Sequence, residues 1–274
     1  SRPLELHRER RRDLVFAAFC SFICLAILSI VAVVIFASFV HLWPYRMTFS
    51  TRHYQFDVQN GIQPLWNSIY ISLMAAGLGV VVVMAAAYVV EKFKSPASRT
   101  IYFLSILPAA VPGMVLGLGY ILAFNNPSNP VYLIYGTLVI IAIANVYYYH
   151  AQGFLIASTS LKQISSTFDE ASATLGGTRL QTLRKVTLPL MAPTLIGVAV
   201  FFFMRSMVTL SAVIFLITPQ TQVAAVSVLL LEDRGATNQA AAFSVCIMVT
   251  VVSALLLVRL LLRLTGIRGL RLIR

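Results

Sequence analysis

Charged residues are scarce in this sequence. Asp, Glu, Lys and Arg make up 11% of its 274 residues, whereas 59% are hydrophobic. In a soluble domain roughly a quarter of the residues are charged, so this composition excludes a soluble globular protein. The chain is expected to lie in a lipid bilayer.

Acidic residues are the scarcest charges, with nine Asp and Glu against 21 Lys and Arg. None of the nine falls inside an apolar run long enough to cross a membrane, and Glu91, at the edge of one, is the nearest. A transporter driven by protons or sodium normally needs carboxylates within the membrane. An ion-coupled secondary transporter, the main alternative from a different class, is therefore disfavoured.

The sequence also lacks the residue patterns that metal binding, redox chemistry and hydrolysis require. The four His show no ligand spacing, and the three Cys lie in apolar runs, where we expect small buried hydrophobic side chains. A membrane enzyme would need His, Asp or Glu clustered at headgroup level. Without a Gly-rich phosphate loop ending in Lys, the chain cannot itself hydrolyse ATP. We therefore predict no metal site and no catalysis; the residues concerned are His7, His41, His53, His150, Cys20, Cys24 and Cys246.

Long apolar runs are the feature that is present. Six of them predict transmembrane helices, at about residues 14–40, 67–90, 101–124, 131–152, 191–217 and 238–262. A further apolar run, 223–231, is too short to cross and is expected to be re-entrant or interfacial. The third run holds Pro108 and Pro112, so we expect it to be kinked and able to line a cavity. The expected fold class is an all-α polytopic membrane protein with six transmembrane helices.

These runs divide the chain into four parts. We predict a basic cytoplasmic N-terminal segment (1–13), a first span with an external loop (14–66), a core of five spans (67–263) and a basic cytoplasmic tail (264–274). The first apolar run is too long for a signal peptide and no small-residue cleavage site follows it, so we expect a retained span.

The Lys and Arg residues predict the orientation. With six spans both termini lie on one side, and seventeen of the 21 basic residues would share that side. The positive-inside rule makes it the cytoplasm. The net charge of +12 then requires no nucleic-acid partner.

The longest polar segment between two spans reads, from Ser165, SSTFDEASATLGGTRLQTLRKVTLPL. Thr167 and Glu170 have the spacing of a capping box, which predicts a short helix beginning there. Gly176 supplies the left-handed residue that commonly closes a helix. A second helical piece is expected to follow until Pro189 interrupts it.

This segment resembles the Glu-Ala-Ala loop of permease subunits of bacterial binding-protein-dependent ABC importers. In that family Glu-Ala-Ala is followed by three residues, Gly, nine residues, Ile, one residue and Leu-Pro. The chain keeps this spacing and departs from the pattern at Ser172 and Val186. The alternative, an amphipathic loop resting on lipid headgroups, does not require this spacing.

The resemblance implies a type I ABC importer permease fold in the bacterial inner membrane. It further implies four kinds of partner: a second permease subunit or half, two ATPase subunits, a periplasmic binding protein and membrane lipid. ATP and Mg would belong to the ATPase, and this chain would bind no cofactor. The loop at 157–190 would contact the ATPase through Thr167, Asp169, Glu170, Ala171, Ser172, Leu175, Gly176, Val186, Leu188 and Pro189.

Arg205 is the one charge placed well inside a predicted span. Counted from Met191 at roughly 1.5 Å per residue it lies near the midplane, where an unpaired cation is costly and usually faces a cavity or a partner. We interpret it either as part of a translocation path or as a structural cap bonded to carbonyls of a kinked neighbour. Tyr147, Tyr148 and Tyr149 are expected to form an interfacial belt. The candidate path residues are Arg205, Thr209, Ser211, Asn145 and Pro112.

Three segments carry a resemblance that concerns the substrate. They are NNPSNP at 125–130, the run 161–164 and SAVIFLITP from Ser211, and they look similar to permeases for 2-aminoethylphosphonate, with ferric-iron and polyamine permeases close behind. A cation within the membrane suits an anionic phosphonate and repels a polyamine. In such importers the binding protein usually sets specificity, so ferric iron and a polyamine both stay open as alternatives.

Overall fold

The computed structural model describes residues 9–56, 61–93 and 95–264. Within them, five helical stretches are long and apolar enough to cross a membrane, or six if a sharply bent pair counts as one span. Most of the predicted basic N-terminal segment and C-terminal tail lies outside the described residues. The five stretches are α1 (Arg10–Ser38), α2 (Gln63–Lys92), α5 (Leu138–Lys162), the run Arg179–Met207 and α10 (Thr237–Leu264).

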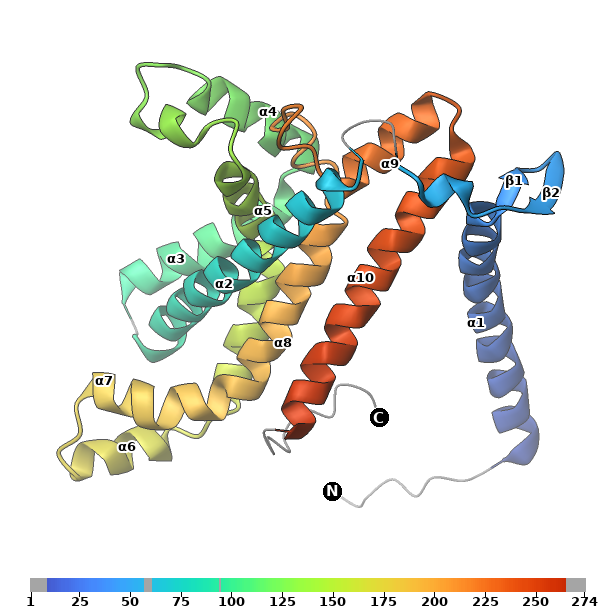
Figure 1. Cartoon of the computed structure of the whole chain (residues 1–274). Helices are drawn as coiled ribbons and strands as arrows, with labels where there is room; N and C mark the ends of the chain where they lie inside the picture. The colour runs from blue at the N-terminus through green and yellow to red at the C-terminus, as the bar shows by residue number, and fades with distance from the viewer. Residues whose placement is uncertain (1–8, 57–60, 94, 265–274) are drawn as a thin grey trace.

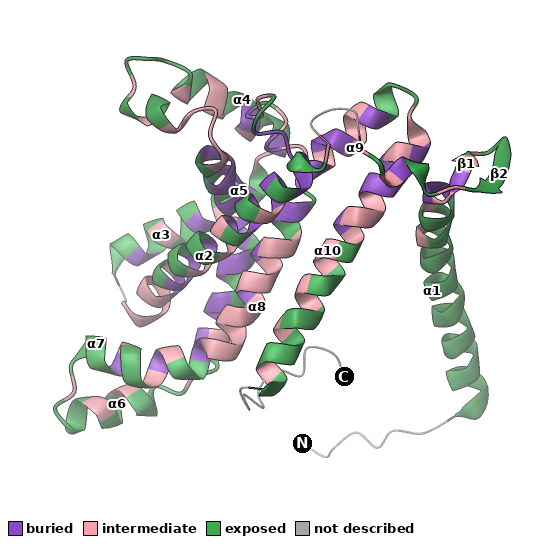
Figure 2. Ribbon diagram, in the orientation of Figure 1, coloured by how far each residue is buried: buried purple, intermediate pink, exposed green. Residues whose placement is uncertain are grey.

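Helix α1 lies at one side of the molecule, where it contacts α10 and is separated from α2, α5 and α8 (Figure 1). Its apolar side chains are exposed along most of its length, which suits a helix surrounded by lipid (Figure 2). Cys20 and Cys24 lie on this helix and are exposed, whereas Cys246 on α10 is partly buried. The prediction that Cys20 and Cys24 are buried was wrong, because hydropathy reports transfer into the bilayer and not contact with protein.

The segment after α1 contains the only strands in the described residues. β1 (Val40–Leu42) and β2 (Arg46–Phe49) form an antiparallel hairpin, which the all-α expectation missed, and the short 3-10 helix η1 (Arg52–Tyr54) follows. Asn238, at the start of α10, accepts a hydrogen bond from the backbone N–H of Trp43 at 3.1 Å. Its amide group donates to the carbonyls of Ala37 at 2.8 Å and Val40 at 3.0 Å, so one side chain ties the hairpin to α10.

The predicted third span is broken and not merely kinked. It consists of α3 (Pro96–Ile106), the 3-10 turn η2 (Leu107–Ala110) and α4 (Gly113–Phe124), and the two helical parts meet at 110°. Pro108 lies within η2 and Pro112 directly before α4, and neither has a backbone N–H to donate to a helical hydrogen bond.

The fourth span lies later in the chain than predicted. The 3-10 helix η3 (Pro130–Ile134) and Gly136, whose φ is +76°, precede it, so α5 begins at Leu138 and continues to Lys162. A residue with left-handed backbone does not fit inside a right-handed helix. Counting apolar residues over 131–137 does not reveal the backbone conformation of Gly136.

The fifth span also differs from its prediction. α7 (Arg179–Thr182), the π-helical turn η4 (Leu183–Thr187) and α8 (Leu188–Met207) form one continuous run, so Pro189 does not interrupt it. Within η4 the N–H of Leu188 reaches back five residues to the carbonyl of Leu183, and this wider turn accommodates a proline without a donor.

Helix α8 ends at Met207 and not near residue 217. The hydroxyl of Thr209 donates to the carbonyl of Arg205 at 2.7 Å and takes the acceptor that a continuing helix would use. Residues 208–223 are non-helical, and the apolar run after them forms α9 (Ala224–Asp233), too short to cross, as predicted.

The core lies where α2, α5 and α8 pack together (Figure 2). Phe202 of α8 is fully buried, and its ring lies against Gly79 of α2 and Gly153 of α5. Small residues let helix backbones approach closely in lipid, where apolar burial cannot drive association.

Candidate functional site

The polar loop forms a helical hairpin at one end of the molecule, away from α9 and the β hairpin (Figure 1). Its first helix is α6 (Thr167–Thr174), and α7 lies beside it. The predicted capping box at Thr167 and Glu170 was wrong. The residue before the helix, Ser166, already has helical backbone angles, and the Thr167 hydroxyl pairs with the hydroxyl of Ser165 at 2.8 Å. A capping residue needs extended backbone.

A capping box does occur at the second helix of the hairpin. Thr178 has extended backbone; its hydroxyl accepts from the N–H of Gln181 at 3.3 Å, and the Gln181 side chain accepts from the N–H of Thr178 at 2.8 Å. This arrangement starts α7 and leads the chain into η4 and α8.

Gly176 ends α6, as predicted. Its φ is +74°, and its N–H donates to the carbonyl of Ala173 at 3.0 Å. The N–H of Gly177 donates to the carbonyl of Ser172 at 2.8 Å, which completes the reversal. Leu175, the last residue before the turn, is 88% exposed.

Ser172, where the family pattern has Ala, joins the two helices of the hairpin. Its hydroxyl pairs with that of Thr182 at 2.6 Å, and Thr182 is buried. The Thr182 hydroxyl is also within 3.2 Å of the carbonyl of Thr178. The departure from the pattern therefore adds a hydrogen bond between α6 and α7.

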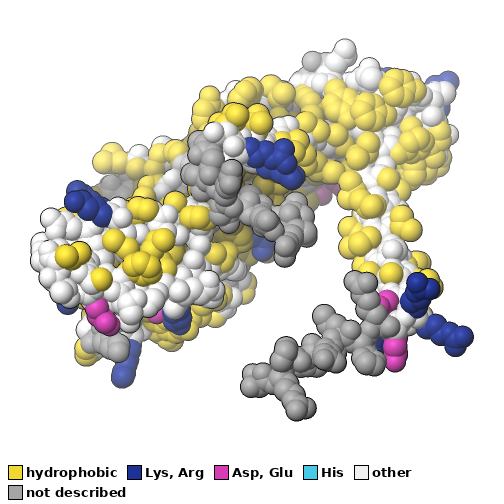
Figure 3. Space-filling view, turned by 90° about the horizontal axis from the view of Figure 1, so that it is seen from below, with side chains coloured by type: hydrophobic (Ala, Val, Ile, Leu, Met, Phe, Trp, Pro, Cys, Tyr) yellow, Lys and Arg dark blue, Asp and Glu magenta, His cyan; other side chains and the backbone are white. Residues whose placement is uncertain are grey.

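The outer face of α6 combines acidic and apolar side chains. Glu170 and Ala171 are exposed, and Phe168 is 48% exposed. Seen from below, hydrophobic side chains gather on this face with acidic and basic ones at its rim (Figure 3). An exposed apolar patch with a polar rim is typical of a protein-binding surface.

Ion pairs connect the hairpin and the helix ends around it. Lys92, at the end of α2, lies 2.5 Å from Asp169 of α6. Glu91 accepts from the hydroxyl of Ser158 at 2.5 Å and lies 3.6 Å from Lys162, so the same end of α2 is also bound to α5. Sequence reasoning missed Lys92 and Glu91, although charges at the ends of apolar spans are the signal that would have found them.

The other end of the hairpin leads into the core. Leu183 and Leu188 pack against the buried cluster around Met191 and Phe202, and Val186 is partly buried. Pro189 is exposed in the first turn of α8. Movement of the hairpin would therefore displace side chains that pack against α2 and α5.

The Lys92–Asp169 pair is expected to hold α6 against α2. Replacing either residue with Ala should lower the free energy of local opening of α6 by roughly 0.2–1 kcal/mol, because the pair is only partly buried. The double variant should lower this free energy no more than either single variant does. Hydrogen exchange of the α6 amides measures this opening. Effects that simply add in the double variant would contradict the pairing.

A second candidate site lies at the break of the third span. A cavity of about 340 Å³ is lined by residues 108–112, Tyr148, Tyr149, Gln152 and Arg205. Arg205 is in the last turn of α8, and its guanidinium carbon lies 5.3 Å from the Tyr149 ring centre and 6.0 Å from that of Phe201. Arg205 is exposed in this chain, and cation–π contacts at exposed sites stabilise a cation by about 0.5–1 kcal/mol.

Two of the five candidate path residues line this cavity: Arg205 and Pro112. Within the described residues no hydrogen bond joins the Arg205 side chain to a carbonyl of 107–112, so the structural-cap interpretation has no contact to support it. Tyr148, Tyr149 and Gln152 were missed as lining residues. Tyr149 is buried and its hydroxyl lies 2.9 Å from the Thr209 hydroxyl, so its predicted place in an interfacial belt was wrong.

The other three candidate path residues have different surroundings. Thr209 is buried and engaged with Tyr149 and the Arg205 carbonyl. Ser211 packs against Gly113 at the start of α4. Asn145 is buried in the core, and its side-chain oxygen has no hydrogen-bond partner in the described part of the chain.

Together these features define a class of protein. Membrane-length helices, one of them broken beside a cavity, surround a core, and a polar helical hairpin extends from one end. This is the architecture of a membrane permease. The chain belongs to the family of binding-protein-dependent transport system inner membrane components, which it matches over residues 79–265.

Named relatives differ in substrate. The chain is 33% identical over 229 residues to the ferric transport system permease protein FbpB of Actinobacillus pleuropneumoniae, covering 82% of this chain and 33% of that protein. It is 29% identical over 175 residues to a putative 2-aminoethylphosphonate transport system permease protein, PhnV, of Salmonella paratyphi A, covering 64% of each. The chain thus spans about a third of the length of this ferric permease.

Solved structures share the fold. A chain of a bacterial ABC transporter that imports the acidic polysaccharide alginate superposes with a TM-score of 0.75 at 17% identity, covering 93% of this chain and 96% of that one. A chain of the MetNI methionine ABC transporter gives a TM-score of 0.54 at 17% identity, covering 73% and 91%. These similarities agree with the predicted type I ABC importer permease fold.

Proposed function

We propose that this subunit forms half of a translocation path and couples it to ATP hydrolysis through the α6–α7 hairpin. Its partners are a second permease subunit or half, two ATPase subunits, which hold ATP and Mg, and a periplasmic binding protein. Both termini face the cytoplasm, and this chain itself binds no cofactor. The observation that carries the proposal is the hairpin: its inner side is bonded to α2 while its outer face, with Glu170 and Leu175, is exposed.

The mechanism follows from the continuity of one helix. The run Arg179–Met207 contains 29 residues and connects the hairpin directly to the cavity, because Arg205 lies in its last turn. Closure of the ATPase subunits would move α6, and the Ser172–Thr182 bond would pass that movement to α7. The π-helical turn η4 then bends or rotates α8, which changes the position of Arg205 in the cavity. ATP hydrolysis thereby alters access to the path.

The proposed substrate is 2-aminoethylphosphonate or a related phosphonate. The lining of the cavity supports it, since Arg205, Tyr148 and Gln152 offer donors to an anionic phosphonate group. The similarity to PhnV supports it as well. Ferric iron is the second candidate, because the similarity to FbpB extends over more of this chain.

Uptake into vesicles tests both substrates. The complete transporter, reconstituted with ATP inside, is expected to take up labelled 2-aminoethylphosphonate when its binding protein is supplied. The Arg205→Gln variant should lower this uptake about tenfold, which is the effect of losing one charged hydrogen bond, and Arg205→Lys should retain more of it. The control is Arg46→Gln, in the exposed strand β2. Uptake of ferric iron without phosphonate uptake would overturn the phosphonate assignment, and ATP-independent uptake would overturn the coupling.

A further inference from the structure

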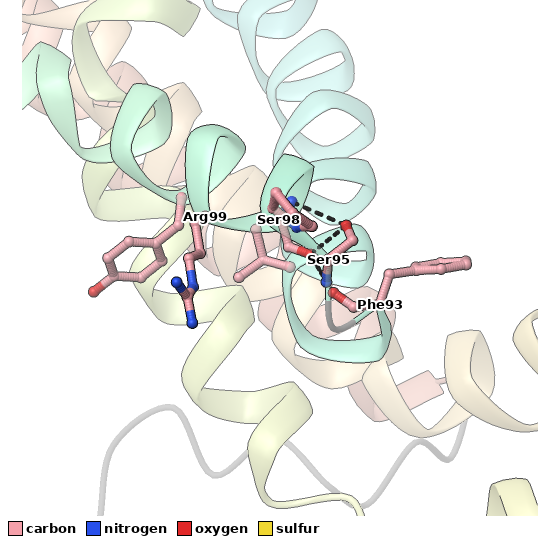
Figure 4. A pocket seen from close by; sticks show the side chains of 7 residues that line it. Phe93, Ser95, Ser98 and Arg99 are labelled. Atoms are coloured by element: carbon pink, nitrogen blue, oxygen red, sulfur yellow. Dashed lines mark hydrogen bonds between the residues drawn. The ribbon is translucent and has the colours of Figure 1, made fainter.

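A hollow at the turn between α2 and α3 belongs to neither candidate site. It has a volume of about 580 Å³ and lies between the end of α2 and the first two turns of α3 (Figure 4). Its lining mixes apolar and polar side chains: Val90, Phe93, Ser95, Pro96, Ser98, Arg99 and Tyr102.

The hollow lies at the depth of the lipid headgroups. The apolar span of α2 ends at Lys92, and α3 begins at Pro96, so the turn between them is where the chain leaves the hydrocarbon and returns to it. Tyr102 is 41% exposed at the rim. Aromatic side chains with one polar end favour this membrane boundary.

The charge of the hollow is of one sign. Arg99 is exposed, and in Figure 4 its guanidinium extends away from the hydroxyls of Ser95 and Ser98. No Asp or Glu occurs among the residues that line the hollow, all of which the structure describes. A second cation, Arg179 of α7, lies 5.0 Å from the centre of the Phe93 ring. The nearby Lys92 is engaged with Asp169.

The two serine hydroxyls in the hollow are already bonded to the protein. The Ser95 and Ser98 hydroxyls lie 3.0 Å apart, and the Ser95 hydroxyl accepts from the N–H of Ser98 at 3.3 Å. Arg99 and the Tyr102 hydroxyl at the rim are therefore the lining groups that offer donors to a ligand, and an arginine favours phosphate oxygens. The apolar wall of Val90, Pro96 and Tyr102 continues toward the membrane interior along α2 and α3.

We propose that this hollow binds an anionic phospholipid such as phosphatidylglycerol. Its phosphate would lie on Arg99, and the part of an acyl chain nearest the headgroup would lie along the apolar wall. A soluble phosphate compound would use Arg99 but leave that wall exposed, whereas a lipid covers both. Basic hollows between membrane helices suit anionic headgroups for the same reason. Because Phe93 contacts Arg179, a bound lipid would also steady the side chain against which α7 rests.

Lipid retention tests the proposal on the complete transporter. The transporter is purified from membranes and placed in phosphatidylcholine nanodiscs with a small fraction of spin-labelled phosphatidylglycerol. We expect the transporter to retain the labelled lipid. Arg99→Gln should lower this retention about fivefold, the effect of one arginine near an anionic headgroup, and Arg99→Lys should preserve most of it. The matched control, Arg184→Gln, removes an exposed arginine outside the hollow and should leave retention unchanged.

Two further arms separate the alternatives. Glycerol phosphate added in excess should fail to displace the labelled lipid; displacement would mean that a soluble phosphate compound occupies the hollow, and would overturn the lipid assignment. Equal retention by Arg99→Gln and the unaltered chain would overturn it too. The lipid assignment would also be overturned if position 99 were protected from a water-soluble reagent only when the ATPase subunits are present. A protein, and not a lipid, would then cover the hollow.

Discussion

Replacing Glu170 with Ala and Gly176 with Val in the same chain is expected to separate ATP hydrolysis from transport. Glu170 is exposed on the outer face of α6, so its replacement removes the ATPase contact that we propose and leaves the internal packing unchanged. Gly176 has φ +74°, a conformation that a β-branched residue adopts only with strain, so the end of α6 would be displaced. Since central contacts of a docking surface are worth about 2 kcal/mol or more, uptake should fall at least about tenfold.

The measurement compares ATP hydrolysis with uptake in the same vesicles. Hydrolysis should continue without stimulation by the binding protein while uptake is lost, and the amount of inserted protein should not change. The control Glu232→Ala removes the same charge from an exposed position of α9 at the opposite end of the molecule, and uptake should be normal. Normal uptake by the double variant would remove the hairpin from the mechanism.

The orientation can be checked with the same position. In a chain whose three native Cys are replaced by Ala, Glu170→Cys should react with a membrane-impermeant reagent only after the cytoplasmic side is opened. Reaction from the periplasmic side would place the hairpin out of reach of an ATPase and overturn the proposed coupling.

Substitution of Gly79 with Ala is expected to destabilise the helix core. A methyl group there would lie 2.7 Å from the ring of Phe202, and one at Gly153 would lie 2.8 Å from the same ring. Because the fully buried ring is held between α2 and α5, it cannot move away from one helix without meeting the other. Each substitution should lower the free energy of unfolding by about 1–3 kcal/mol, the usual cost of overpacking, and the pair by more.

Gly77, on the same helix, is the matched control for this prediction. A methyl group there meets no atom within 4 Å, so Gly77→Ala should leave stability unchanged or raise it by about 0.5–1 kcal/mol through helix propensity. Combining Gly79→Ala with Phe202→Leu should recover part of the loss. Reversible unfolding in mixed micelles measures all of these variants. Equal effects at Gly77 and Gly79 would contradict the described packing.

Several features were predictable because they depend on neighbouring residues. The long apolar runs predicted α2 and α10 to within a few residues, and the left-handed residue at the end of α6 followed from Gly176. Predictions that required a choice between local conformations were less successful. Thr167 had the spacing of a cap but not the backbone, and Pro189 was accommodated by a π-helical turn.

The amino-acid sequence by itself determined that this chain lies in a bilayer, the approximate bounds of α2 and α10, and which polar loop carries the family pattern. Only the tertiary structure decided which side chains meet: Lys92 with Asp169, the Phe202 ring with two glycines, and Arg205 with the break of the third span. The physical reason is range. Hydropathy and turn propensities depend on residues a few positions apart, whereas these contacts join helices that are distant in the chain and depend on how whole surfaces pack.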